Sequence, residues 1–185
     1  MNIFIDTCHE DLVIALYNHD LKLKSYKIKE KLKQKAEILP KLFEEFLYEN
    51  DLKTKDIQNF YINLGPGTFT GVRIALVFVR TIAQVTNANV FTTNSFNLIS
   101  FGNELKQNYF IDAKGKTAYK AIAQNGKILS NIEVVSKEVV NSFDYLFIIN
   151  NFLKLVNKNV FEHQKNLLKI QPLYVKKMQI GSTTK

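Results

Sequence analysis

The stretch that decides the fold reads Asn63-Leu64-Gly65-Pro66-Gly67-Thr68-Phe69-Thr70-Gly71-Val72-Arg73-Ile74-Ala75, and an apolar run follows it to about Val85. Three of the seven glycines of the chain fall in this one stretch. The segment before it, residues 60–64, has the aromatic and β-branched content of a strand. The pattern therefore predicts a strand, a tight glycine loop and a helix.

The predicted helix carries more apolar surface than its own core requires. Steps of about 100° per residue place one apolar face on Val72, Ala75, Leu76, Val79, Ile82 and Ala83, and a second on Ile74, Val77, Phe78 and Val85. A surface helix needs an apolar stripe only a little wider than about 100°. Something must cover the second face, and the candidates are another helix of the same chain or a partner subunit.

The composition indicates a globular protein of a reducing compartment. With 185 residues, of which 46% are hydrophobic, the chain can form one compact domain or two small subdomains. No apolar run approaches the roughly 20 residues that a membrane span needs, and the first residues do not resemble a signal peptide. The single cysteine, Cys8, excludes an internal disulfide. We expect a cytoplasmic protein without membrane contact.

The charge permits contact with nucleic acid or with an acidic protein. The formal net charge is +8 and the pI is about 9.4. The lysines are scattered among Asn, Ile and Phe along the whole chain. This distribution favours a generally basic surface over a dedicated nucleic-acid patch.

Hydrophobic periodicity predicts alternating strands and helices in the first half. The expected strands are 2–6, 12–17, 21–28, 58–64 and 89–93. The expected helices are 32–49, which contains Pro40, then the apolar helix to Val85, and a third that Asn94 or Ser95 caps and that reaches about Gly102.

The second half is predicted to repeat the order of three strands, helix, strand and helix. The expected elements are strands 108–112, 117–124 and 127–135, a short helix from Ser136 or Lys137, a strand 145–149 and a helix 152–156, with residues 167–177 as an extended tail and 181–185 loose. An Asn125-Gly126 turn joins the second and third strands. The first strand ends in an acid both times, Asp6 and Asp112, which favours two related subdomains. We place them at residues 1–103 and 104–185.

The glycine loop has two interpretations. Backbone N–H groups and the helix dipole converge on such a loop, so it can hold a phosphate group. Alternatively, the glycines permit a tight turn and a close approach of helix and strand. The motif is neither a Walker loop nor a dinucleotide fingerprint. The residues that either interpretation uses are Asp6, Thr7, Gly65, Gly67, Thr68 and Gly71, with Thr68 or Thr70 as the N-cap of the helix.

The two acids that end first strands occupy the position where actin-like ATPases and kinases keep an acid for a magnesium-bound phosphate. A working loop of that type usually has glycine beside the acid, whereas Asp6 is followed by Thr7, Cys8 and His9. An actin-like ATP-binding phosphotransferase or ATPase is therefore the alternative and not the favoured function.

The remaining reactive side chains predict no catalytic or metal site. His9, His19 and His163 form no HxxxH or HExxH pair, so we expect a lone surface histidine at each position. Cys8 is expected to be a buried structural thiol. The sequence contains no set of nucleophile, base and acid that indicates a protease.

Four segments together resemble the TsaB (YeaZ) family. They are Ile5-Asp6-Thr7, Ile38-Leu39-Pro40, the run from Gly65 to Ile74, and Ile111-Asp112-Ala113-Lys114. The glycine run is highly specific, and the segments occur in the family's order over roughly the first 120 residues. The segment Pro172-Leu173-Tyr174-Val175 resembles the closing segment of the family more loosely.

The resemblance implies an α/β, actin-like (ASKHA, RNase H-like) fold with two subdomains, of which the C-terminal one is reduced. It implies a non-catalytic scaffold or activator that dimerises with TsaD. TsaD, with the ATPase TsaE, transfers a threonylcarbamoyl group to the adenosine beside the anticodon of tRNA. The chain itself would require no cofactor, with ATP and a metal on the partner subunits, and would contact tRNA through the complex and form a homodimer when alone. The partner-binding residues expected on the first two helices are Leu42, Ile74, Val77, Phe78, Thr81 and Val85.

Overall fold

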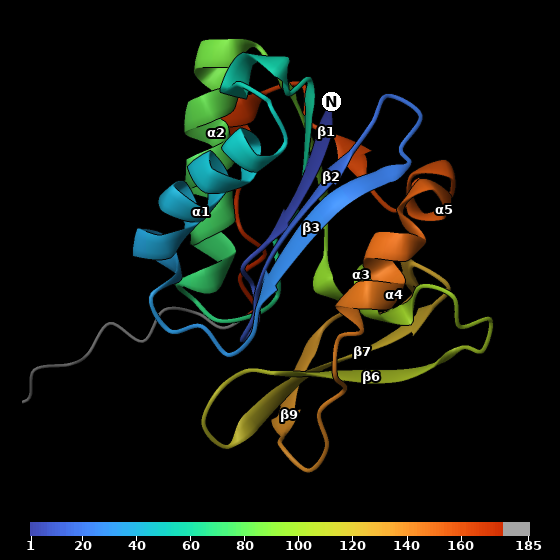
Figure 1. Cartoon of the computed structure of the whole chain (residues 1–185). Helices are drawn as coiled ribbons and strands as arrows, with labels where there is room; N and C mark the ends of the chain where they lie inside the picture. Colours follow the sequence, from blue (N-terminus) through green and yellow to red (C-terminus); the bar gives the residue numbers. More distant parts are fainter. Residues whose placement is uncertain (176–185) are drawn as a thin grey trace, which may run out of the picture.

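A six-stranded sheet forms the centre of the computed structural model, which describes residues 1–175 (Figure 1). The strand order is β10-β5-β4-β1-β2-β3. The strands are β1 (Asn2–Asp6), β2 (Leu12–Tyr17), β3 (Leu23–Lys29), β4 (Asn59–Asn63), β5 (Asn89–Thr93) and β10 (Glu162–His163). β1, β2 and β3 form an antiparallel meander, while β4 pairs in parallel with β1 on one side and β5 on the other. The five longer strands confirm those predicted for the first half, and the short β10 was not predicted.

Two long helices cover one face of this sheet (Figure 1). α1 (Lys35–Glu49) and α2 (Gly71–Thr86) share a core with the alternate strand residues Ile3, Ile5 and Leu16. Pro40 lies inside α1, about one and a half turns from its start, where it lacks the N–H that would donate to the Ala36 carbonyl. The short 3-10 turns Thr54–Asp56 and Leu167–Lys169 border the same layer.

Three short helices lie on the opposite side of this sheet. They are α3 (Ser95–Ser100), α4 (Tyr145–Asn150) and α5 (Phe152–Asn157), and α3 also packs against the second, smaller sheet. Their core includes Phe4 and Tyr17, which alternate with the residues that face α1 and α2. The Tyr17 ring stacks on Phe152 at a centroid distance of 4.2 Å. The Asn94 side chain accepts the Asn97 N–H, which confirms Asn94 as the cap of α3.

The second sheet is smaller and has β7 (Thr117–Gln124) at its centre. β6 (Gln107–Asp112) pairs with one edge of β7, and β8 (Lys127–Ile128) and β9 (Glu133–Ser136) pair with the other. The predicted turn is confirmed, because Asn125 and Gly126 both have positive φ, at 42° and 85°. The predicted strand 127–135 is divided, since residues 129–132 leave the ladder between β8 and β9.

The predicted repeat is wrong. Residues 137–144 form no regular secondary structure, and residues 145–149 are helical where a strand was expected. The apolar run from Tyr145 to Ile149 fits either structure, because short apolar runs carry no clear period. The Asp144 side chain decides for the helix by accepting the Phe147 N–H at 2.8 Å. α4 and α5 then return to the first sheet instead of extending the second, and the boundary at residues 103 and 104 stays a prediction.

The end of the described chain lies along α2 as an extended segment. The Leu173 N–H donates to the Leu64 carbonyl at 2.8 Å, and the Arg73 side chain lies over the Phe69 ring and donates to the Tyr174 hydroxyl. This confirms the predicted extended tail for residues 170–175, whereas Leu167–Lys169 form a 3-10 turn where extended chain was expected. Lys176, Lys177 and the predicted loose end 181–185 lie outside the described residues. Within residues 1–175, no helix is both long and apolar enough to cross a membrane.

Candidate functional site

The glycine loop packs directly against the backbone of the loop that follows β1. The Thr68 N–H donates to the Cys8 carbonyl at 2.8 Å. A Cβ atom added at Gly67 would lie 2.4 Å from the Cys8 oxygen, and one added at Gly71 would lie 2.3 Å from the Thr7 oxygen. Such contacts are far below van der Waals distance, so only glycine fits. The geometry favours the structural interpretation of the loop over a phosphate cradle.

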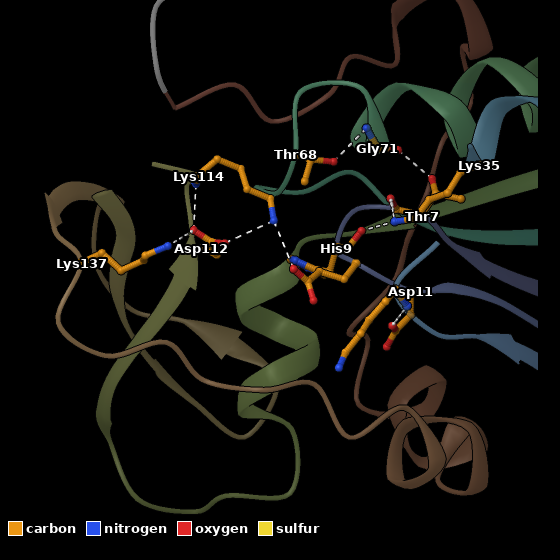
Figure 2. Close-up of polar contacts among 11 residues, drawn as sticks. Thr7, His9, Asp11, Lys35, Thr68, Gly71, Asp112, Lys114 and Lys137 are labelled. Carbon is orange, nitrogen blue, oxygen red and sulfur yellow. Dashed lines mark hydrogen bonds and ion pairs between the residues drawn. The ribbon is translucent and has the colours of Figure 1, made fainter. Parts of the chain in front are cut away.

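Atoms of the chain also satisfy the first N–H groups of α2 (Figure 2). The Thr68 Oγ1 accepts the Gly71 N–H at 3.0 Å, the Thr68 carbonyl accepts the Val72 N–H at 3.1 Å, and the Thr70 carbonyl accepts the next two. One residue further into the helix, the Thr7 Oγ1 accepts the Ala75 N–H at 3.2 Å. The Thr7 hydroxyl in turn donates to the Gly71 carbonyl at 2.6 Å. Thr68 thus performs the predicted capping, whereas the Thr70 side chain makes no cap hydrogen bond. These donors are not directed at a bound anion.

The Asp6 carboxylate is fully buried and surrounded by donors. It accepts the Cys8 N–H at 2.8 Å, the Asn63 amide at 2.9 Å and the Tyr145 hydroxyl at 3.1 Å. Burial, and then the Asp6 charge, raises the pKa of both the Cys8 thiol and the Tyr145 phenol. The buried thiol at position 8 confirms the expectation for that residue. Asp6 therefore acts as an internal hydrogen-bond acceptor, and its carboxylate does not face solvent.

A buried lysine lies close to this carboxylate. Lys35 is 5% exposed, and its ammonium donates to the Thr7 carbonyl at 3.1 Å and to the His9 carbonyl. Burial lowers its pKa, while the negative charge of Asp6 opposes that effect. Sequence reasoning missed Lys35, although its position four residues before Leu39 places it on the buried stripe of α1. Asp6 and Lys35 compensate each other's charge inside the fold.

His9 is not the surface histidine that the sequence predicted. Its Nε2 lies 3.0 Å from the Ser95 Oγ, and its ring stacks on Phe143 at a centroid distance of 3.9 Å. Ser95 is fully buried and its hydroxyl also contacts Asn63, so this serine and histidine cannot present a nucleophile to a substrate. His19 and His163 are exposed, as expected.

The environment of His9 predicts a dependence of stability on pH. Burial lowers the pKa of His9 to about 4, against about 6.5 in an unfolded chain. The unfolded state therefore binds more protons between these values, and the fold loses stability as the pH falls through this window. We expect urea unfolding to show a loss of at most about 2 kcal/mol between about pH 7.5 and pH 5, because the ring is only half-buried. His9→Gln should flatten this part of the profile, and an unchanged profile would contradict the assignment.

A cleft of about 510 Å³ lies between the two sheets. Asp112 lines it and pairs with Lys114 at 3.3 Å and Lys137 at 3.2 Å, while Lys114 also reaches Glu10 at 3.4 Å (Figure 2). Burial alone would raise the pKa of Asp112, but the Lys114 N–H and the two ammonium groups outweigh it and lower the pKa. The second acid is therefore neutralised by lysines.

Among residues 1–175, no three His, Cys, Asp or Glu side chains are grouped to hold a metal ion.

An apolar groove of about 460 Å³ separates α1 from α2 on the outer side of the molecule. Its lining is Ala36, Leu39, Pro40, Thr70, Arg73, Ile74, Val77, Phe78, Thr81 and Ile82. Val77 is 59% exposed, and Val85, further along α2, is 81% exposed. α1 covers part of the second face of α2, because Phe43 meets Phe78 edge to face at 5.1 Å. Within residues 1–175, nothing covers the exposed remainder of that face, which includes Val77 and Val85.

The groove brings together most of the residues predicted to contact a partner. Ile74 and Phe78 are half-buried, and Thr81 is exposed. Leu42 is different, since its side chain is 2% exposed and belongs to the core beneath α1. We therefore correct the predicted set by removing Leu42, because a residue on the inner stripe of α1 cannot touch another protein.

Comparison with solved structures places the fold in a known class. YeaZ from Pseudomonas aeruginosa superimposes with a TM-score of 0.62 over 77% of this chain and 71% of its own, at 20% identity. A protein described as similar to peptidase YEAZ from Pseudomonas aeruginosa gives a TM-score of 0.71 over 95% and 99% of the two chains, at 17% identity. The architecture is thus the actin-like α/β fold of YeaZ.

The family is shown by the sequence itself. A family model described as TsaD, tRNA N6-adenosine threonylcarbamoyltransferase, matches residues 29–181. The chain belongs to this family and is a protein of the TsaB (YeaZ) type. A relative from Mycoplasma genitalium, protein MG208, is 26% identical over 94% of each chain, and its Mycoplasma pneumoniae homologue is 29% identical over 72% of each. Family membership connects the chain with the threonylcarbamoyladenosine modification of tRNA.

Proposed function

We propose that the chain is a non-catalytic scaffold subunit that pairs with TsaD through the outer face of α1 and α2. The observation that carries the proposal is the apolar groove between these helices, which residues 1–175 leave uncovered and which exposed Val85 extends along α2. Contiguous apolar patches of more than a few hundred Å² are uncommon on proteins that act as monomers. A helix of a partner laid along the groove would bury this surface.

The inner site supports a role without catalysis. The Asp6 carboxylate is occupied by three donors, and the glycine loop is filled by the chain's own backbone. Asp112 is paired with two lysines. Each group that an actin-like enzyme would direct at a magnesium-bound phosphate is here engaged within the protein. ATP and the metal are accordingly assigned to partner subunits.

The same face accounts for the other proposed associations. Without TsaD, two copies of the chain would cover their grooves by pairing with each other, since the same patch serves both copies of a two-fold dimer. TsaE and tRNA would join through the TsaD complex, in the cytoplasm.

The alternative, an independent ATP-binding phosphotransferase or ATPase, requires Asp6 to leave its three donors. Micromolar binding of Mg-ATP to the isolated chain in calorimetric titration would favour that alternative.

Replacing Val77 with glutamate is the direct test of the pairing. A carboxylate at the centre of the apolar groove would lose its hydration when a partner docks, so we expect affinity for TsaD to fall at least about tenfold, or about 1.4 kcal/mol. Co-purification with tagged TsaD measures this loss. Val77 is preferable to Phe78, because Phe78 packs on Phe43 and its replacement would also disturb the fold.

Leu105→Glu is the matched control. Leu105 is 71% exposed and lies before β6, outside the groove. The Leu105→Glu substitution introduces the same apolar-to-acid change as Val77→Glu, and it should leave co-purification with TsaD and the thermal melt unchanged. If Val77→Glu retains full binding of TsaD while folded, the proposed interface is wrong.

A further inference from the structure

A basic cavity adjoins the cleft between the sheets. It has a volume of about 400 Å³, and four of its lining residues are lysines, namely Lys31, Lys33, Lys35 and Lys114. Glu10 is the one acidic residue of its lining. We call this the lysine cavity. Lys31, Lys33 and Lys35 alternate along one short stretch of the sequence, and only the fold brings Lys114 to them.

The lysines come from segments that are distant in sequence. Lys31 and Lys33 belong to the connection from β3 to α1, at the end of the first sheet that faces the second sheet (Figure 1). Lys114 belongs to the turn between β6 and β7. The ammonium group of Lys35 already donates hydrogen bonds to carbonyl groups of the chain. A ligand would therefore meet the exposed lysines 31 and 33 on one wall and Lys114 on the other.

The ion pairs of Lys114 do not prevent this use. Its contacts with Glu10 at 3.4 Å and Asp112 at 3.3 Å involve a lysine side chain that is half exposed. Pairs of this kind contribute about 0–1 kcal/mol, because solvent screens them. A phosphate group can replace them at small cost.

The adjoining cleft contributes two half-buried rings, those of His9 and Phe143, and its lining mixes three lysines with the carboxylates of Glu10, Asp11, Glu30 and Asp112. The rings of His9, Phe143 and Tyr145 are stacked in series, at centroid distances of 3.9 Å and 5.7 Å. The cleft and the lysine cavity share His9, Glu10, Lys31, Thr68 and Lys114, so they are continuous. Basic grooves beside aromatic side chains are typical of sites that follow single-stranded nucleic acid, where phosphates meet lysines and bases meet rings.

We propose that the lysine cavity binds the phosphate backbone of RNA, namely a single-stranded segment of the tRNA that the complex modifies. The inference rests on the proposed function, because that complex determines which RNA is presented. The cavity shares Thr70 and Ile74 with the groove between α1 and α2. RNA held there would lie at the edge of the surface that TsaD covers.

The test compares two double substitutions of equal charge. Lys31→Glu with Lys33→Glu changes the lysine cavity, whereas Lys22→Glu with Lys24→Glu changes exposed lysines at the other end of β3. Fluorescence anisotropy of a labelled full-length tRNA transcript, titrated with the full chain at several salt concentrations, gives the affinity and its salt dependence. We expect the first variant to bind at least about tenfold more weakly and to lower the slope of log affinity against log salt by about 1.4. The control should lose less than about threefold.

Three results would overturn the inference. The first is equal weakening by both variants, because the attraction would then depend on net charge alone. The second is an absence of tRNA binding by the parent chain. The third is displacement of tRNA by ATP that binds the chain at micromolar concentration. Co-purification with TsaD separates this test from that of the proposed function. The lysine variant should still bind TsaD, and loss of tRNA affinity with intact TsaD binding supports both proposals.

Discussion

Gly71→Ala should destabilise the protein by about 3 kcal/mol or more. The new methyl group would lie 2.3 Å from the Thr7 carbonyl oxygen and 2.4 Å from the Thr68 hydroxyl oxygen. The first of these is backbone at the end of β1, in the centre of the main sheet, and cannot move aside as a flexible side chain would. α2 would have to shift away from the sheet. In a chain of this size the apparent melting temperature should fall by about 6–12 °C.

Gly115→Ala is the matched control for this substitution. Gly115 lies in the turn between β6 and β7, where no atom comes within 4 Å of an added Cβ, although its φ of 66° carries a penalty for alanine. We expect a loss of only about 1 kcal/mol. Thermal melts of the two variants compare the stability lost through a steric clash, in Gly71→Ala, with the stability lost through backbone strain, in Gly115→Ala. If Gly71→Ala were as mild as Gly115→Ala, the glycine loop would not be the close-packed turn described above.

Asp6→Asn should cost about 3 kcal/mol of unfolding free energy. The carboxylate accepts from Cys8, Asn63 and Tyr145, whereas an amide offers one oxygen and directs an NH₂ group at donors. The substitution also removes the negative charge that interacts most strongly with the buried Lys35. Denaturant unfolding with fluorescence or circular dichroism measures the loss.

Asp112→Asn provides the comparison, because Asp112 stands at the equivalent point of the second sheet. Its ion pairs are partly exposed to solvent, so we expect a loss of less than about 1 kcal/mol. A catalytic role for Asp6 would produce the opposite pattern, with unchanged or increased stability and a loss of ATP-dependent activity. A stable Asp6→Asn variant would therefore count against the structural role of this residue.

The sequence was sufficient to predict the five longer strands of the main sheet and the two long helices that cover one of its faces. β1 to β5, α1, α2 and the Asn125-Gly126 turn have clear periods or clear turn residues, and these local signals agree with the packing. The TsaB (YeaZ) resemblance was confirmed by the family match. The surplus of apolar surface on α2 was also correctly predicted, since Val77 and Val85 remain exposed.

The rest depended on tertiary contacts that no local pattern contains. The apolar run 145–149 becomes helix because Asp144 caps it and because its buried face meets the far side of the main sheet. β10 is only two residues long and exists through its pairing with β5. Neither feature has a periodic signal of its own.

The inner site was only partly predictable for the same reason. Asp6 and the glycine loop were identified, but the three donors that engage the carboxylate come from β4, α4 and the loop after β1. The half-buried position of His9 depends on Ser95 and Phe143, which are 86 and 134 residues away in sequence. The lysine cavity likewise joins residues 31 and 33 to residue 114. In all three cases, the residues that form the feature are too far apart in the sequence for a local pattern to indicate it.

The central claim, that this chain supports tRNA modification by holding TsaD on its α1 and α2 face, is tested most directly by reconstitution. TsaD and TsaE, with tRNA and the substrates of the reaction, would be assayed for threonylcarbamoyladenosine with no added chain, with the parent chain, with Val77→Glu and with Leu105→Glu. The account predicts that the parent chain and Leu105→Glu raise the rate at least about tenfold over the other two reactions, the same factor as the expected loss of TsaD binding. Equal rates with and without the chain, or full activity of Val77→Glu, would contradict it.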